Sequence, residues 1–96
     1  MMDKELYQRK MQAQLDEWKA DVDKLKAKAS GASADTQLKM NEQIKALDSK
    51  IAEGNAKLSE LSRAGEDAWE SIREGVESAW DSLKSAVSDA AAKFKD

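Results

Sequence analysis

Apolar residues recur at intervals of three and four along the first thirty residues, and polar or charged residues separate them. The members of this stripe are Tyr7, Met11, Leu15, Trp18, Val22, Leu25 and Ala29. Such spacing places an apolar side chain on the same face of a helix in every turn, and a seven-residue repeat of this kind is typical of coiled coils. Asp3 precedes the stripe and can act as an N-cap, because its carboxylate accepts a hydrogen bond from the first turn. The pattern predicts a helix from near Asp3 to near Ala29.

A second stripe with the same spacing follows a short polar stretch, Ser30–Asp35, that contains a glycine. The members of the second stripe are Met40, Ile44, Leu47, Ile51, Gly54, Leu58 and Leu61. Polar stretches with glycine between periodic segments indicate a turn, and Asp35 is a suitable cap for the helix that follows. We therefore expect residues 1–62 to form an antiparallel helical hairpin whose turn lies near residues 30–35.

The register of this hairpin follows from its turn. If the chain reverses within residues 30–35, residues whose numbers add to about 65 or 66 face one another across the two helices. Leu15 then faces Ile51, and apolar residues meet at each level of the hairpin. The flexible side chain of Met11 faces the gap that Gly54 leaves in the second stripe.

The last third of the chain contains an eleven-residue repeat. AWESIREGVES, Ala68–Ser78, is followed directly by AWDSLKSAVSD, Ala79–Asp89. Eleven residues make three helical turns plus about 20°, so the apolar residues of both units stay on one face. We expect residues 63–96 to form an amphipathic helix that carries this face. The residues of the face are Trp69, Ile72, Val76, Trp80, Leu83, Val87 and Phe94.

Two arrangements of the third segment agree with the sequence. The apolar stripe keeps its phase across Gly65, which favours one helix that runs unbroken from the second segment into the third. A glycine inside a helix costs only about 1 kcal/mol relative to alanine. Alternatively, the chain bends at Gly65 and folds back as the third helix of a bundle. In both arrangements the fold class is all-α, because the chain has no proline and consists mainly of strong helix formers.

The apolar face of residues 63–96 must be buried against another apolar surface. A hairpin of two helices buries little apolar surface, so we expect this face to pack on another copy of the chain or back on the hairpin. Self-association would make the protein a homo-oligomer, and a helix from another protein is an alternative partner. A lipid surface is a further alternative, although this segment carries eight acidic and five basic side chains, which oppose binding to anionic bilayers.

Composition limits the chemistry that the chain can perform. It contains no Cys and no His, which removes thiol chemistry and the commonest general base and metal ligand. Carboxylates occur in pairs, such as Asp21 and Asp23, but a thin hairpin offers no pocket that would change their protonation. We therefore expect a non-enzymatic protein with no catalytic residue, no cofactor and no metal site.

Charge and hydropathy narrow the partners and the location. The net charge is −3 and the basic residues form no cluster, which argues against nucleic acid as a partner. The polar N-terminus does not match a signal peptide, and no apolar run approaches the roughly 20 residues that cross a bilayer. We expect a cytoplasmic protein.

Two segments carry a resemblance to a known group of proteins. They are YQRKMQAQLDEWKADVDKLKAKA, residues 7–29, and DAWESIREGVESAWDSLKSAVSDA, residues 67–90. The chain resembles small bacterial coiled-coil proteins, some of them described as stress-related, and this resemblance implies a coiled coil without supplying catalytic residues. The eleven-residue repeat is also loosely similar to the amphipathic repeats of apolipoproteins and desiccation-protective proteins.

These observations predict a structural or interaction protein that self-associates through its Trp-bearing face. The alternative is a stress-related protein that binds reversibly to a lipid surface or to partly unfolded protein.

Overall fold

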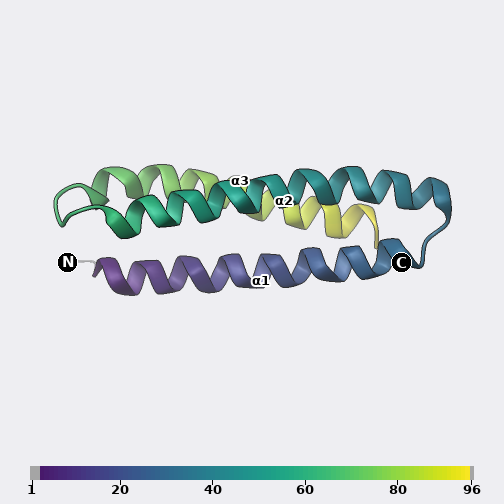
Figure 1. Cartoon of the computed structure of the whole chain (residues 1–96), viewed down its shortest axis with the longest axis horizontal. Helices are drawn as coiled ribbons and strands as arrows, with labels where there is room; N and C mark the ends of the chain where they lie inside the picture. Colours follow the sequence, from purple (N-terminus) through teal and green to yellow (C-terminus); the bar gives the residue numbers. More distant parts are fainter. Residues whose placement is uncertain (1–2, 96) are drawn as a thin grey trace.

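Three helices lie side by side in a computed structural model that describes residues 3–95 (Figure 1). They are α1 (Lys4–Ser30), α2 (Ala34–Arg63) and α3 (Trp69–Lys93). The molecule measures 51 × 17 × 17 Å, and α1 and α3 run in one direction while α2 runs in the other. The all-α fold class is confirmed, and the arrangement formed is the three-helix bundle.

The start of α1 agrees with the sequence, whereas the start of α2 does not. Asp3 caps α1, and its carboxylate accepts a hydrogen bond of 2.9 Å from the backbone N–H of Glu5. The cap of α2 is Ser33, whose hydroxyl accepts a hydrogen bond of 3.4 Å from the N–H of Thr36. The prediction that Asp35 caps α2 is wrong, because the cap lies two residues earlier, at Ser33. Asp35 lies in its first turn, where a negative charge suits the positive end of the helix dipole.

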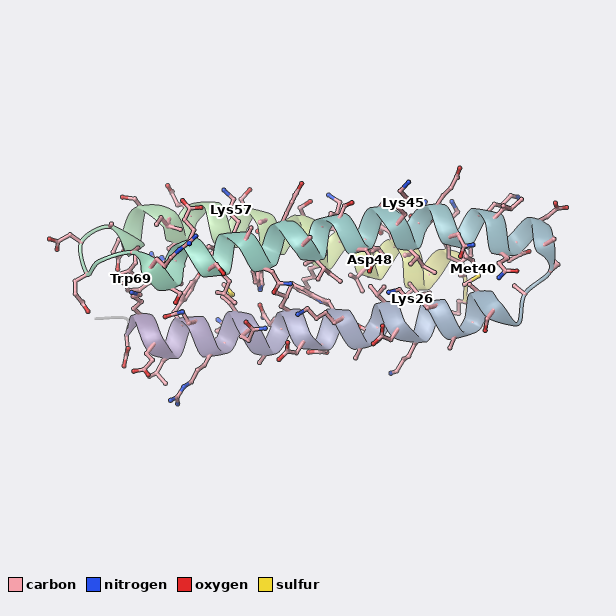
Figure 2. All side chains as sticks on the ribbon, viewed as in Figure 1. Lys26, Met40, Lys45, Asp48, Lys57 and Trp69 are labelled. Atoms are coloured by element: carbon pink, nitrogen blue, oxygen red, sulfur yellow. The ribbon has the colours of Figure 1, made fainter. Side chains whose placement is uncertain are left out.

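The hairpin of α1 and α2 closes at both ends of the rod. At the end with the α2–α3 loop, the ammonium group of Lys4 donates hydrogen bonds to the backbone carbonyls of Ser62 and Ala64. Ser62 belongs to the last turn of α2 and Ala64 is its C-cap residue, so no further helical N–H group is available to these carbonyls. Nearer the α1–α2 turn, Lys26 Nζ lies 3.4 Å from Asp48 Oδ2 on the surface (Figure 2). The chain therefore reverses between α1 and α2 as the two stripes predicted.

The expectation of an unbroken helix through Gly65 is wrong. α2 ends at Arg63, and the loop of residues 64–68 precedes α3. The N–H groups of Ala68 and Trp69 both donate to the carbonyl of Gly65, which turns the chain back. A break forfeits a few helical hydrogen bonds, but folding α3 back buries a row of large apolar side chains, each worth about 1.5–3 kcal/mol. α2 and α3 both direct their apolar faces toward one core. The apolar stripe therefore keeps its phase across Gly65 even though the helix is broken there.

The gap in the α2 stripe at Gly54 is filled from α3. A Cβ atom on Gly54 would lie 3.2 Å from Leu15 Cδ1 and 3.4 Å from Cη2 and Cζ3 of Trp80. The prediction that Met11 fills this gap is wrong, because that register considered α1 and α2 alone. Met11 is buried, but it meets α3 through its carbonyl oxygen, which accepts a hydrogen bond from the Trp80 indole. Gly54 is thus the position where the missing side chain makes room for an indole ring.

Substitution of two helical glycines is expected to change stability in opposite directions. A Cβ atom on Gly75 would meet nothing within 4 Å, so Gly75→Ala is expected to stabilise the protein by about 1 kcal/mol through helix propensity alone. Gly54→Leu is expected to destabilise it by about 1–3 kcal/mol, because the added side chain must displace Trp80 or Leu15. Urea unfolding of both variants measures the two effects. A Gly54→Leu protein as stable as the wild type would contradict the packing of Trp80 on α2.

Candidate interaction face

The structure places the predicted interaction face inside the chain's own bundle. Five of its seven residues are buried, and the other two, Ile72 and Phe94, are partly buried and pack against the same core. The buried five are Trp69, Val76, Trp80, Leu83 and Val87. Figure 2 shows Trp69 at the end of the rod that holds the α2–α3 loop. The apolar face of α3 therefore packs against the hairpin of the same chain, whereas the sequence favoured packing against a second copy.

Two aromatic pairs join α1 to α3. The ring centroids of Tyr7 and Trp69 are 5.8 Å apart with an interplanar angle of 45°, and those of Trp18 and Trp80 are 6.2 Å apart at 60°. Tilted pairs at such distances are favourable beyond the area that they bury. Tyr7 and Trp18 are eleven residues apart on α1, as Trp69 and Trp80 are on α3. Because the two helices run in the same direction, one repeat length brings both pairs into contact.

This pairing explains the eleven-residue repeat, and the sequence contained the signal for it. The heptad interpretation of residues 7–29 assigns Trp18 to the hairpin core alone. The equal spacing of Tyr7 and Trp18 on one side, and of Trp69 and Trp80 on the other, is the signal in the sequence for a third helix parallel to α1.

Trp80 contacts both other helices. Its Nε1–H group donates a buried hydrogen bond of 3.1 Å to the carbonyl oxygen of Met11 on α1. Its six-membered ring lies against the backbone of Gly54 on α2, and only 3% of Trp80 is exposed to solvent. A buried indole N–H without a partner would cost free energy, so the hydrogen bond also selects this orientation of the ring.

The environment of Tyr7 changes its titration. Burial, and to a smaller extent the nearby carboxylate of Glu77, together raise the pKa of the Tyr7 phenol to about 12, while Arg73 acts in the opposite direction. The hydroxyl lies beside Glu77 without a hydrogen bond of good geometry. Tyr7 is therefore a neutral phenol over the physiological pH range, and its main role is packing against Trp69.

A groove lies between α1 and the C-terminal half of α3. Its volume is about 360 Å³, and its lining is mostly apolar. The lining residues are Trp18, Asp21, Lys24, Leu25, Lys28, Lys84, Val87, Ser88 and Ala91. The next members of the two eleven-residue series are Ala29 and Ala91, so no third aromatic pair follows the first two.

The described residues provide no arrangement for metal binding or membrane crossing. Within residues 3–95, no three His, Cys, Asp or Glu side chains come together as metal ligands would. None of the three helices is long and apolar enough to span a bilayer. Of the paired carboxylates, Asp21 is partly buried at the groove and Asp23 is exposed.

Comparisons with protein-family models, with curated proteins and with solved structures find no match to this chain. The resemblance of residues 7–29 and 67–90 to small bacterial coiled-coil proteins stays a prediction. Function is therefore inferred from the geometry of the bundle itself.

Proposed function

We propose that this chain is a non-enzymatic structural or interaction protein whose working unit is the closed three-helix bundle. The observation that carries this proposal is the double aromatic contact, which attaches α3 along α1 and places the apolar face inside. The exterior is then polar and highly charged, as 36% of the residues are Asp, Glu, Lys or Arg. The absence of His and Cys from the sequence supports the non-enzymatic part. A cytoplasmic location is part of the proposal.

We propose that the chain self-associates in a way that keeps the aromatic contacts between α1 and α3. Two copies could exchange α3 through the loop of residues 64–68, so that each α3 packs on the hairpin of the other copy. Every aromatic pair would form as in the closed chain, but between chains. The working unit would still be a bundle with a buried apolar face.

One crosslink distinguishes the closed chain from the exchanged dimer. Lys50 Nζ of α2 lies 3.1 Å from Ser82 Oγ of α3, so a short bis-maleimide fits between cysteines placed at these two positions. The chain has no cysteine of its own, so only these two react. Lys50→Cys/Ser82→Cys is expected to give a crosslinked product of monomer mass on a denaturing gel. A product of dimer mass at low protein concentration would show that α3 is exchanged, and the single-cysteine variants serve as controls.

The alternative function is reversible binding to a lipid surface or to partly unfolded protein under stress. It is favoured by the start of α3, where Ala68 provides no side-chain cap and the space around Gly65 is open. α3 is thus the helix with the weakest N-terminal anchoring, and its release would expose Trp69 and Trp80. The same crosslink tests this function, because it prevents release. If the crosslinked protein still bound vesicles or an unfolded client as the uncrosslinked protein does, release of α3 would not be the mechanism.

A further inference from the structure

The groove between α1 and α3 lies beside the second aromatic pair, toward the C-terminal end of both helices. Two aromatic pairs fill the α1–α3 interface at Tyr7–Trp69 and at Trp18–Trp80. One repeat further along, both helices carry alanine, and Ala91 lines the groove that opens there. Its volume of about 360 Å³ is near the lower end of the range of ligand sites, about 300–1,000 Å³. Of these two alanines, Ala91 lines the groove, whereas Ala29 is buried in the core.

The charges at the groove are opposite in sign to the net charge of the chain. Lys24, Lys28 and Lys84 line it, and Asp21 is its only acidic residue. The whole chain has a net charge of −3, whereas Lys24 and Lys84 place two positive charges at exposed positions of the groove against the single carboxylate of Asp21. The ammonium of Lys28 donates a hydrogen bond of 2.8 Å to the carbonyl of Phe94, which connects α1 to the end of α3 beside the groove. Lys24 and Lys84 come from the two opposite walls.

We propose that this groove binds a small amphipathic anion, namely a monocarboxylate with a single unbranched apolar chain. The apolar chain lies in the groove against Trp18 and Ala91. The carboxylate faces Lys24 and Lys84, where the local positive charge attracts an anion. A groove of this volume suits one chain and excludes a helix, which measures about 10–12 Å across with its side chains.

Titration with decanoate below its micelle concentration tests the proposal, with the full-length protein and calorimetric detection. Decanoate is expected to bind at one saturable site, and decyltrimethylammonium, with the same chain length and the opposite charge, about fivefold more weakly or worse. Added salt is expected to weaken the binding of decanoate by screening the lysines. Equal binding of both amphiphiles, or no saturation with decanoate, would overturn the proposal.

Two neighbouring alanines provide a matched pair of variants. Ala91→Trp fills the groove and is expected to weaken decanoate binding about tenfold or more. Ala92→Trp adds the same side chain at an exposed position outside the groove lining and is expected to leave binding unchanged. Equal binding by the two variants would show that decanoate binds elsewhere. Circular dichroism confirms that both variants stay helical.

A charge variant and a mass measurement complete the test. Lys24→Glu and Lys84→Glu, both at exposed positions, are each expected to weaken decanoate binding about two- to fivefold, while leaving the helical content unchanged. Charge reversal without effect on binding would remove the assigned role of the lysines. A wild-type protein that is dimeric by sedimentation, while Ala91→Trp is monomeric, would identify a second copy as the occupant and overturn the proposal.

Discussion

Replacing Trp80 with alanine is expected to lower the free energy of unfolding by about 3–5 kcal/mol. The substitution removes the ring that fills the space over Gly54, the aromatic contact with Trp18 and the buried hydrogen bond to Met11. A domain of this length typically has a total stability of about 5–14 kcal/mol, so the variant loses a large fraction of it. Urea unfolding followed by circular dichroism measures the loss.

Two further variants separate the contributions of Trp80. Trp80→Phe keeps an aromatic ring but removes the N–H donor, so its loss is expected to be smaller than that of alanine. Trp18→Ala removes the other member of the pair at a partly buried position and is also expected to cost less. If Trp18→Ala destabilised the protein as much as Trp80→Ala, the central position assigned to Trp80 between α1 and α2 would be wrong.

Alkaline pH is expected to destabilise the bundle through Tyr7. Below pH 10 the phenol is neutral in the folded and the unfolded chain, so it does not make stability depend on pH. Between pH 10 and about 12 the unfolded chain ionises while the folded chain, with its raised pKa, does not. Unfolding then releases a proton and becomes easier as pH rises, and a shift of about two units corresponds to a loss of about 2–3 kcal/mol.

A matched variant isolates this effect from the titration of the lysines. Tyr7→Phe keeps the packing against Trp69 and has no ionisable group, so it is expected to lose less stability than the wild type between pH 10 and 12. Tyr7 is the only tyrosine, so the absorbance of tyrosinate reports its pKa directly. Glu77→Gln removes the second cause of the shift and is expected to lower that pKa. A midpoint near 10 in the folded protein would contradict the burial of the phenol.

The apolar stripes predicted the helices of the hairpin, but not the break between α2 and α3 or the contacts of α3 with the hairpin. The heptad stripes predicted α1 and α2 because a soluble helix shows its buried face in every turn. The bend at Gly65 could not be predicted from phase, since a continuous and a folded-back helix both keep their apolar residues toward one core. The N-cap of α2 was misplaced because Ser33 and Asp35 are both good capping residues, and only the local backbone selects between them.

Predicting the groove from the sequence would have required the direction of α3 relative to α1. Ala29 and Ala91 are unremarkable in the sequence, because alanine is a frequent residue in any helix of this composition. Ala91 can be placed at a groove only when α1 and α3 are known to be parallel and the offset between Tyr7 and Trp69 is known, whereas Ala29 lies in the core. The interaction face was predicted as a set of residues, but periodicity could not assign its cover to the hairpin or to another copy.

The odd number of antiparallel helices has a mechanical consequence. The start of α1 and the end of α3 lie toward opposite ends of the rod, whereas the ends of a two-helix hairpin would meet at one end (Figure 1). A force that pulls the start of α1 and the end of α3 apart acts along the rod and slides α1 against α3. The Tyr7–Trp69 and Trp18–Trp80 contacts lie in the same sliding interface, so they carry the load together instead of opening one after the other. The bundle therefore resists tension in shear, which is the loading that suits a short, stiff connector.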